Sequence, residues 1–295
     1  MKLLVSGATG FIGKHLVKRL TKDGYNLFSI VRPSSKSETM EKVTPYIFDG
    51  NIDQLTFFMK KNHFAGVIHL ASLFLAQHKS GDIKELINSN VLFATSLLEA
   101  SVKSNIPWFI NTGTFWQHYQ NKEYSPVNLY AATKQAFENI ARYYIETSEI
   151  NFVTIKLCDT FGPEDPRVKI FNLWLKISKT KEVLDMSPGE QIIDISYIDN
   201  VIDGYIQMMV LLSQDQKKEL MGKSFAIKSN ERITLKKLAE VFEQVTQTKL
   251  HINWSKKEYR QREVMIPWKN GETIPGWQPK ISIEEGIKKT FNLTA

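Results

Sequence analysis

Cysteine is almost absent from this chain, since Cys158 is the only one among 295 residues. A single thiol excludes an internal disulfide and a metal cluster held by thiolates, so we predict no metal site. No apolar run approaches the roughly 18 residues that suggest a membrane span. Met1 and Lys2 lead directly into an apolar segment, which leaves no room for a signal peptide. We therefore expect a cytoplasmic protein that does not engage a membrane.

The sequence also lacks a concentrated basic tract. The formal net charge of +7 would suit an anionic substrate or a nucleic acid, but Lys and Arg are scattered along the chain. We therefore predict no nucleic-acid partner. The length is sufficient for one large α/β domain and a smaller lobe.

The first twenty residues combine a short apolar run, three glycines and a helical pattern. Residues 3–5 predict a buried strand, and the apolar residues from 12 to 20 recur at helical spacing. In the order strand, turn and helix, Gly7 would form the turn, Gly10 would admit a pyrophosphate and Gly13 would let helix and strand pack closely. This context predicts a dinucleotide-binding site at the helix N-terminus. The alternative is a glycine turn in an ordinary strand–helix unit.

Short apolar segments continue along the chain at 25–31, 44–48, 66–71, 106–112 and 151–157, and long helical patterns lie at 82–104 and 129–145. Strands that alternate with helices predict a doubly wound parallel sheet of the Rossmann type. We assign this domain to residues 1–160, with a returning segment at about 190–210, and the rest of 161–295 mainly to a smaller α/β substrate-binding lobe. A ligand should lie between the lobes, beyond the strand ends.

The end of the second predicted strand bears on the choice of cofactor. In this fold an acidic residue there binds the 2′-hydroxyl of NAD, whereas an Arg accommodates the 2′-phosphate of NADP. Arg32 stands at that place, and Ser34 and Ser35 follow it. The first acidic residue after Arg32 is Glu38. The pattern favours NADPH and leaves NAD(H) possible. The alternative is that Arg32 is a solvated loop charge.

The predicted helix over 129–145 carries Tyr130 and Lys134 on one face, one turn apart. A phenol with a pKa near 10 is a poor acid or base at neutral pH, and a nearby ammonium favours the phenolate and lowers that pKa. Reduction of a ketone by hydride needs a proton at the oxygen. Tyr130 would supply it, while Thr112 at the end of the fifth strand would hydrogen-bond the oxygen. The alternative is an exposed helix pair with a packed aromatic ring.

Several motifs together resemble the extended short-chain dehydrogenases/reductases, the NAD-dependent epimerase/dehydratase family that acts on nucleotide sugars. They are the glycine pattern over 7–13, His-Leu-Ala at 69–71, Asn-Val at 90–91, Phe-Gly-Pro at 161–163 and Gly-Trp-Gln-Pro at 276–279. The resemblance covers the whole chain. Within the family, the sequence is most similar to 4-ketoreductases of CDP-linked 4-keto-3,6-dideoxyhexoses.

The resemblance implies further site residues. With the positions named above, the expected cofactor-binding set is Gly7, Thr9, Gly10, Phe11, Ile12, Gly13, Arg32, Ser34, Ser35, Asn51, Ile52, Leu70, Ala71, Ser72, Asn90, Tyr130 and Lys134. The expected substrate-binding set is Thr112, Thr114, Trp116, Tyr130, Asp159 and Arg262. Arg262 suits a diphosphate because its planar fork binds two oxygens. Trp116 is as easily explained by core packing.

At two positions the sequence differs from other members of the family, and these differences make some of the family's reactions less probable for this chain. Gly113 and Thr114 occupy the places that include an acidic residue in dehydratases, and the enzymes that make GDP-fucose carry a Cys at the position of Thr114. The resemblance therefore implies NADPH-dependent reduction of the 4-keto group of a CDP-, dTDP- or GDP-linked deoxysugar, in the synthesis of surface polysaccharide such as the O-antigen of lipopolysaccharide. The alternatives are a C4 epimerase that retains NAD and a non-catalytic dinucleotide-sensing protein. Relatives dimerise through four-helix bundles, so we expect a homodimer formed by the helices at 82–104 and 129–145.

Overall fold

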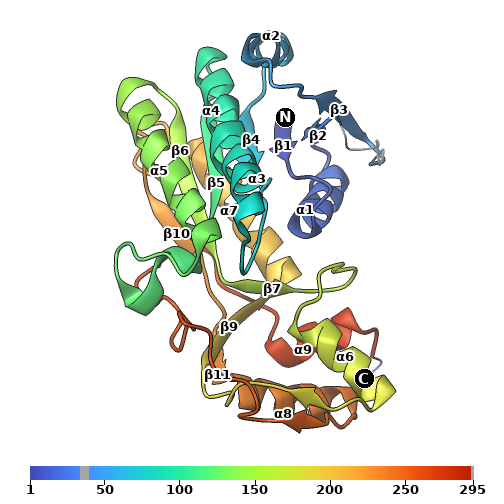
Figure 1. Ribbon diagram of the computed structural model, residues 1–295. Helices are drawn as coiled ribbons and strands as arrows, with labels where there is room; N and C mark the ends of the chain where they lie inside the picture. Colours follow the sequence, from blue (N-terminus) through green and yellow to red (C-terminus); the bar gives the residue numbers. More distant parts are fainter. Residues whose placement is uncertain (34–39, 294–295) are drawn as a thin grey trace.

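The computed structural model describes residues 1–33 and 40–293. Its largest element is an eight-stranded sheet with the order β13-β10-β6-β5-β4-β1-β2-β3, in which all neighbouring strands are parallel (Figure 1). The strands are β1 (Lys2–Ser6), β2 (Asn26–Val31), β3 (Val43–Ile47), β4 (Gly66–His69), β5 (Trp108–Thr114), β6 (Asn151–Leu157), β10 (Ser224–Ile227) and β13 (Glu272–Thr273). Within this sheet the strands β3-β2-β1-β4-β5-β6 have the order of a Rossmann fold, which confirms the predicted fold class.

Helices cover both faces of the sheet. On one face α1 (Phe11–Lys22) packs against α7 (Ile198–Gln214). On the other face α4 (Phe93–Lys103) lies between α2 (Ile52–Asn62) and α5 (Leu129–Thr147) (Figure 1). The helices bury apolar side chains against the strands, and the central strands β1, β4, β5 and β6 are almost wholly buried because they are covered on both sides.

The helix predicted over 82–104 is interrupted. It consists of a short turn η1 (Ser80–Asp82), α3 (Ile83–Ile87), a π-helical segment η2 (Asn88–Leu92) and α4. The wider π turn contains Asn90, which is fully buried. Such turns break the regular helical ladder and are often found at functional sites.

The remaining elements form a smaller lobe below the strand ends (Figure 1). A three-stranded sheet has the order β11-β9-β7, and β12 pairs with β8. The elements of this lobe are β7 (Asp159–Phe161), α6 (Ile170–Thr180), β8 (Leu184–Asp185), β9 (Ile192–Tyr197), β11 (Arg232–Thr234), α8 (Leu235–Thr246), β12 (Ile252–Asn253) and α9 (Ile283–Thr290).

The division of the chain near residue 160 stays a prediction. The stretch at 190–210 supplies α7 to the layer on the large sheet, but its strand β9 lies in the small sheet. Two strands from beyond residue 160, β10 and β13, extend the large sheet at its β6 edge. The C-terminal half therefore contributes to both sheets.

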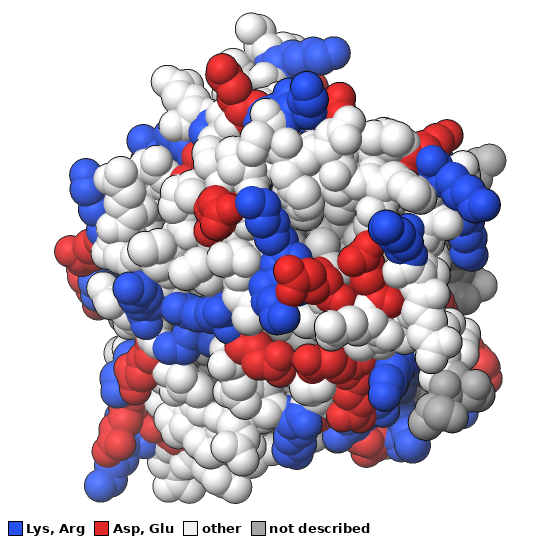
Figure 2. All heavy atoms as spheres, turned by 90° about the horizontal axis from the view of Figure 1, so that it is seen from below, with Lys and Arg blue, Asp and Glu red and all other residues white. Residues whose placement is uncertain are grey.

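Positive and negative side chains are mixed on the face of the molecule that lies at the bottom of Figure 1. Figure 2 shows Lys and Arg interspersed with Asp and Glu there, and not gathered into one basic tract. Among the helices of residues 1–33 and 40–293, none has the length and apolarity that a membrane span requires. Within the same residues, no three His, Cys, Asp or Glu side chains come together as a metal site would require.

Candidate active site

A cavity of about 1280 Å³ lies between the carboxyl ends of the large sheet and the smaller lobe. This volume exceeds the roughly 300–1,000 Å³ of a pocket for one drug-sized ligand. Its upper wall includes Tyr130, Lys134 and Thr112, and its lower wall includes β9 and the segment around Arg262. The cavity therefore brings together the predicted catalytic residues and the predicted phosphate-binding arginine.

The glycine turn before α1 has the geometry of a phosphate cradle. Gly7 has a φ of +75°, and a Cβ there would lie 2.5 Å from the backbone nitrogen of Ala71. A Cβ on Gly13 would lie 2.1 Å from the carbonyl oxygen of Gly7, so the fold itself requires both glycines. A Cβ on Gly10 would approach just one described atom within 4 Å, the same oxygen at 3.3 Å. The space at Gly10, beside the first turn of α1, fits the pyrophosphate of a dinucleotide.

Neighbouring predicted cofactor residues surround this turn. Thr9 is exposed, Phe11 is buried, and Ile12 and Leu70 line the cavity. The hydroxyl group of Ser72 lies beside Tyr130, where it lowers the pKa of the phenol.

At the far side of the sheet, Arg32 is exposed at the end of β2. Ser34 and Ser35 lie outside the described residues. Asn51 caps α2, its Oδ1 accepting the backbone N–H of Gln54 at 3.0 Å, and Ile52 is the first residue of that helix.

Asn90 ties three elements together. Its Oδ1 accepts from the Ser72 hydroxyl at 3.0 Å and from the backbone N–H of Leu73 at 2.7 Å. Its Nδ2 donates to the Leu73 carbonyl at 3.0 Å and to the Thr133 hydroxyl at 2.9 Å. These four bonds use the whole capacity of the amide. Asn90 thus holds the loop after β4 against α5, and its predicted contact with a cofactor stays a prediction.

Helix α5 presents Tyr130 and Lys134 to the cavity. Asn128 caps its N-terminus, with Oδ1 accepting from the backbone N–H of Ala131 at 3.0 Å. Lys134 is 1% exposed, and burial lowers its pKa to about 8, against the opposing effect of the Glu138 carboxylate. Burial likewise raises the pKa of Tyr130 to about 12.

The predicted lowering of the Tyr130 pKa by Lys134 is wrong for this structure. Loss of solvent around the phenol outweighs the neighbouring charges, and the groups that oppose it are the Ser72 hydroxyl and Arg167. The phenol is therefore fully protonated at neutral pH.

The Thr112 hydroxyl has a partner that the sequence did not suggest. Its Oγ1 lies 2.7 Å from the hydroxyl oxygen of Tyr205, a fully buried residue of α7. In the sequence, Tyr205 is one of many apolar positions of a helix, so no pattern distinguishes it. Thr114, two residues on, lies on the same side of β5. Its Oγ1 accepts from the backbone N–H of Trp116 at 3.3 Å, and its own proton is thus available to a ligand.

A buried polar network supports the end of β5. Gln117 accepts the backbone N–H of Thr114 at 2.9 Å and donates to Glu138 at 2.9 Å. Glu138 pairs with Lys156 at 3.3 Å, and Lys156 lies 2.9 Å from Nε2 of His118. Burial and the Lys156 charge lower the pKa of His118 to about 4, so this imidazole is neutral at physiological pH.

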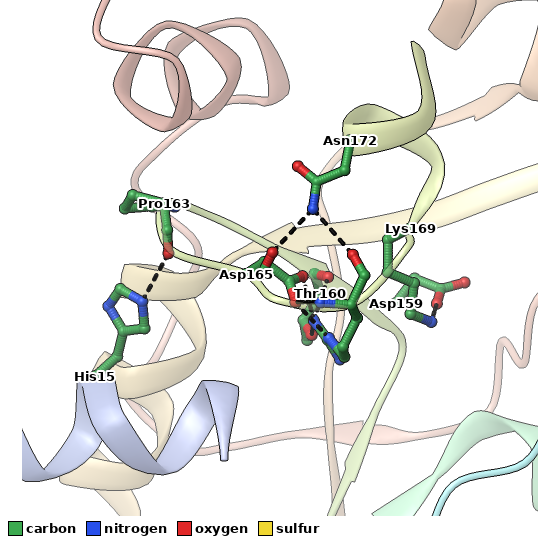
Figure 3. Close-up of polar contacts among 8 residues, drawn as sticks. His15, Asp159, Thr160, Pro163, Asp165, Lys169 and Asn172 are labelled. Atoms are coloured by element: carbon green, nitrogen blue, oxygen red, sulfur yellow. Dashed lines mark hydrogen bonds and ion pairs between the residues drawn. The ribbon is translucent and has the colours of Figure 1, made fainter. Parts of the chain in front are cut away.

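The loop between β7 and α6 contributes residues 167–169 to the lining of the cavity. Figure 3 shows the polar contacts of this loop. Arg167 donates to both carboxylate oxygens of Asp165 at 2.7 Å and lies over the ring of Phe11 at 4.5 Å. Figure 3 shows His15 of α1 pointing to the Pro163 carbonyl, 3.1 Å away, and Asn172 bonding the loop from α6. The loop is thus anchored to the helix that follows the glycine turn.

The remaining predicted substrate residues also line the cavity. Asp159 pairs with Lys169 at 3.0 Å, and the Trp116 ring packs against Phe74. Arg262 donates to the Ser125 hydroxyl at 2.7 Å, and its buried Nε has no partner among the described residues. The guanidinium group of Arg262 lines the cavity, where it is suited to an anionic ligand.

The fold, the glycine turn and the Tyr-x-x-x-Lys helix together define an extended short-chain dehydrogenase/reductase. The chain belongs to the NAD-dependent epimerase/dehydratase family, whose profile matches residues 3–221. It is 26% identical over 297 residues to CDP-abequose synthase of Salmonella muenchen, covering 99% of this chain and 97% of that protein. It is 24% identical over 320 residues to UDP-glucuronate 4-epimerase of Thermodesulfobacterium geofontis, covering 98% and 94%.

Solved structures show the same fold. The UDP-glucose 4-epimerase of Thermotoga maritima with UDP-glucose superimposes with a TM-score of 0.84 at 21% identity, covering 99% of this chain and 98% of that one. The UDP-glucuronic acid 4-epimerase of Bacillus cereus, in complex with UDP-glucuronic acid and NAD, has a TM-score of 0.82 at 22% identity and the same coverage. These likenesses confirm the predicted fold.

Proposed function

We propose that this protein catalyses the NADPH-dependent reduction of the 4-keto group of a nucleotide-linked deoxysugar. The observation that carries the proposal is one cavity that holds Tyr130, Lys134 and Thr112 at one end and Arg262 on its other wall. The first three residues are the proton-transfer set, and the fourth suits a diphosphate. Similarity over nearly the full length to CDP-abequose synthase supports a substrate of this class.

The chain's own residues would manage the proton and the charge. When bound, the nicotinamide cofactor would supply the hydride. The Tyr130 hydroxyl is protonated at neutral pH and would donate its proton to the carbonyl oxygen as negative charge develops there. The buried Lys134 ammonium would stabilise the phenolate left behind. Thr112 and Thr114 place two hydroxyl groups on the same side of β5, where they would orient the oxygen.

Residues around the glycine turn would hold the cofactor. The backbone at Gly10 and the first turn of α1 would bind the pyrophosphate. Arg32 at the end of β2 would bind a 2′-phosphate, which is the reason to propose NADPH. The Bacillus cereus structure contains NAD, so NAD(H) is the competing choice.

A C4 epimerase that retains NAD is the second candidate. The observation that favours it is the similarity to UDP-sugar 4-epimerases in both sequence and fold. Both reactions would use Tyr130 for proton transfer, so the reason to place the epimerase second is Arg32, which stands at the end of β2 where an acidic residue would bind the ribose of NAD.

The helices predicted to form the homodimer, at 82–104 and 129–145, carry exposed apolar side chains. Ile83, Ile87, Leu92 and Tyr143, on α3, η2 and α5, are each more than 40% exposed. Pairing these helices between two copies would bury this apolar surface in a four-helix bundle. Molar mass in solution, measured by light scattering, tests this directly: a monomer at micromolar concentration contradicts it.

The function is tested by following NADPH absorbance with freshly prepared CDP-, dTDP- and GDP-linked 4-keto-6-deoxy and 3,6-dideoxy sugars. We expect turnover with one nucleotide series and its loss in Tyr130→Phe. Interconversion of a 4-hydroxy sugar nucleotide with its epimer, without NADPH consumption, would establish the epimerase instead. Activity that survives in Tyr130→Phe would remove Tyr130 from the chemistry, and a protein that binds NADPH without any turnover would be a dinucleotide sensor.

A further inference from the structure

Arg262 is held on the cavity wall by uncharged partners. Its Nη2 donates to the Ser125 hydroxyl at 2.7 Å, and its guanidinium carbon lies 4.2 Å from the centre of the Tyr119 ring. Two residues earlier, Arg260 pairs with the carboxylate of Glu263 at 3.2 Å, whereas within the described part of the chain Arg262 makes no such ion pair. The charge of Arg262 is therefore available to an anion in the cavity.

The two partners of Arg262 belong to the loop that follows β5. Tyr119 and Ser125 are both described residues, and neither lines the cavity, whereas Arg262 does. Any effect of these two residues on a ligand in the cavity must therefore pass through the guanidinium group. A long side chain that is held in place before a ligand arrives loses less rotational freedom on binding, so the ligand binds more tightly. The face of an aromatic ring suits this purpose, because the planar guanidinium group stacks on it.

The loop that carries Tyr119 and Ser125 turns sharply between them. Gln120 and Asn121 have φ angles of +57° and +60°, in the left-handed region that residues other than glycine seldom adopt. Such a backbone costs free energy and persists only where the surrounding contacts determine it. The backbone N–H of Tyr119 donates to the Ser125 carbonyl at 2.8 Å and closes the turn. The ring and the hydroxyl are thus brought to the same guanidinium group.

The same loop joins the two walls of the cavity. At its start, Gln117 accepts the backbone N–H of Thr114 at 2.9 Å, which anchors the loop to the end of β5. Further on, Asn121 accepts the backbone N–H of Lys269 at 2.6 Å, in the segment that carries Arg262. The loop therefore fixes the guanidinium group relative to the hydroxyl groups of β5. A substrate bound at both places would have its reacting carbon set by this spacing.

We propose that Tyr119 and Ser125 are positioning residues, which hold the guanidinium group of Arg262 in the orientation that binds the diphosphate of the substrate. This inference rests on the proposed function, in which Arg262 contacts that diphosphate. Tyr119 acts through the face of its ring, so a phenylalanine at that place would do the same. Ser125 acts through its hydroxyl group, which accepts a hydrogen bond from a charged donor.

The test measures binding of nucleoside diphosphates by calorimetry to protein saturated with NADPH, so that the glycine turn is already occupied. CDP, UDP, dTDP and GDP are titrated into the wild type, and the one that binds most tightly is used with the variants. Tyr119→Leu and Ser125→Ala should each weaken its binding roughly 3-fold to 20-fold. Tyr119→Phe keeps the ring and should bind as the wild type does. Tyr124→Leu, at an exposed position of the same loop, is the matched control and should also leave binding unchanged.

The variant Arg262→Met separates positioning from a general structural role. It should bind the diphosphate at least ~10-fold more weakly. In this background Tyr119→Leu and Ser125→Ala should cause no further loss, because both residues act through the guanidinium group. NADPH affinity, measured in parallel, should be the same in all these proteins, which shows that the variants are folded.

The outcomes distinguish this inference from the proposed function. Wild-type affinity in both Tyr119→Leu and Ser125→Ala overturns the inference and leaves the proposed function standing. The same holds if their losses persist in full without Arg262, or if Tyr119→Phe binds as weakly as Tyr119→Leu. A wild-type protein that binds none of the four diphosphates, or an Arg262→Met variant with wild-type affinity, overturns the role of Arg262 in the proposed function and this inference with it.

Discussion

Replacement of Lys134 by Met should stabilise the protein while it abolishes catalysis. Burial lowers the pKa of this ammonium from 10.5 to about 8, so the folded state carries the charge at a cost. At about 1.4 kcal/mol per pH unit, the difference corresponds to roughly 3 kcal/mol at neutral pH. Met fills the same space without charge, and Glu138 keeps its partner Lys156 at 3.3 Å. We expect a gain of about 1–3 kcal/mol in the free energy of unfolding at pH 7.

The stability gained by Lys134→Met should depend on pH, and the protonation of residue 134 sets the direction of that dependence. Between pH 8 and 10.5 the unfolded chain binds a proton at residue 134 and the folded chain does not, so wild-type stability at this residue rises with pH. The advantage of Lys134→Met, measured by urea unfolding, should therefore shrink from pH 7 to about pH 10. Lys60→Met, on the exposed face of α2, is the control and should change stability little at either pH. Equal stability of wild type and Lys134→Met at pH 7, or a gain that does not shrink, refutes the reasoning.

Three other predictions follow from contacts of single residues. Gly10→Ala should fold normally and bind NADPH at least ~10-fold more weakly by fluorescence titration, whereas Gly13→Ala, whose Cβ would lie 2.1 Å from an oxygen, should unfold at lower urea concentration. Arg32→Asp should reverse the preference for NADPH over NADH in steady-state assays. An unchanged ratio of kcat/KM for the two cofactors would show that Arg32 is only a solvated surface charge. Tyr205→Phe should lower kcat roughly 5-fold to 50-fold and leave KM similar. In a Thr112→Val background the same change should lower kcat no further, because the two hydroxyl groups act together.

The large sheet and the glycine turn were predictable because their signals are local. Residues 3–13 contain the strand, the turn and the helix start within one short stretch, and the clashes at Gly7 and Gly13 arise from atoms of the same unit or of the adjacent strand. The Tyr-x-x-x-Lys spacing is local in the same way, because one helical turn places both side chains on one face.

The rest of the site depends on contacts between residues far apart in sequence. Tyr205 reaches Thr112 across 93 positions, and Asn90 meets Thr133 across 43. Helical periodicity predicts burial at such positions but not the partner of a hydroxyl or an amide. The pKa of Tyr130 was mispredicted for a related reason, because the spacing reveals a neighbouring charge but not the loss of solvent around the phenol.

The attachment of β10 to β6 has a consequence for how this protein is made. Strand β6 is buried along its whole length, and its outer edge is covered when residues 224–227 pair with it. A nascent chain that has emerged only to residue 160 would present an open, apolar strand edge, the kind of surface that recruits other chains. We therefore expect the large sheet to stay incomplete during synthesis until residues 224–227 have emerged. Completion of the large sheet awaits β10, a strand that follows β9 in the chain, so the sheet closes only when the C-terminal half is present.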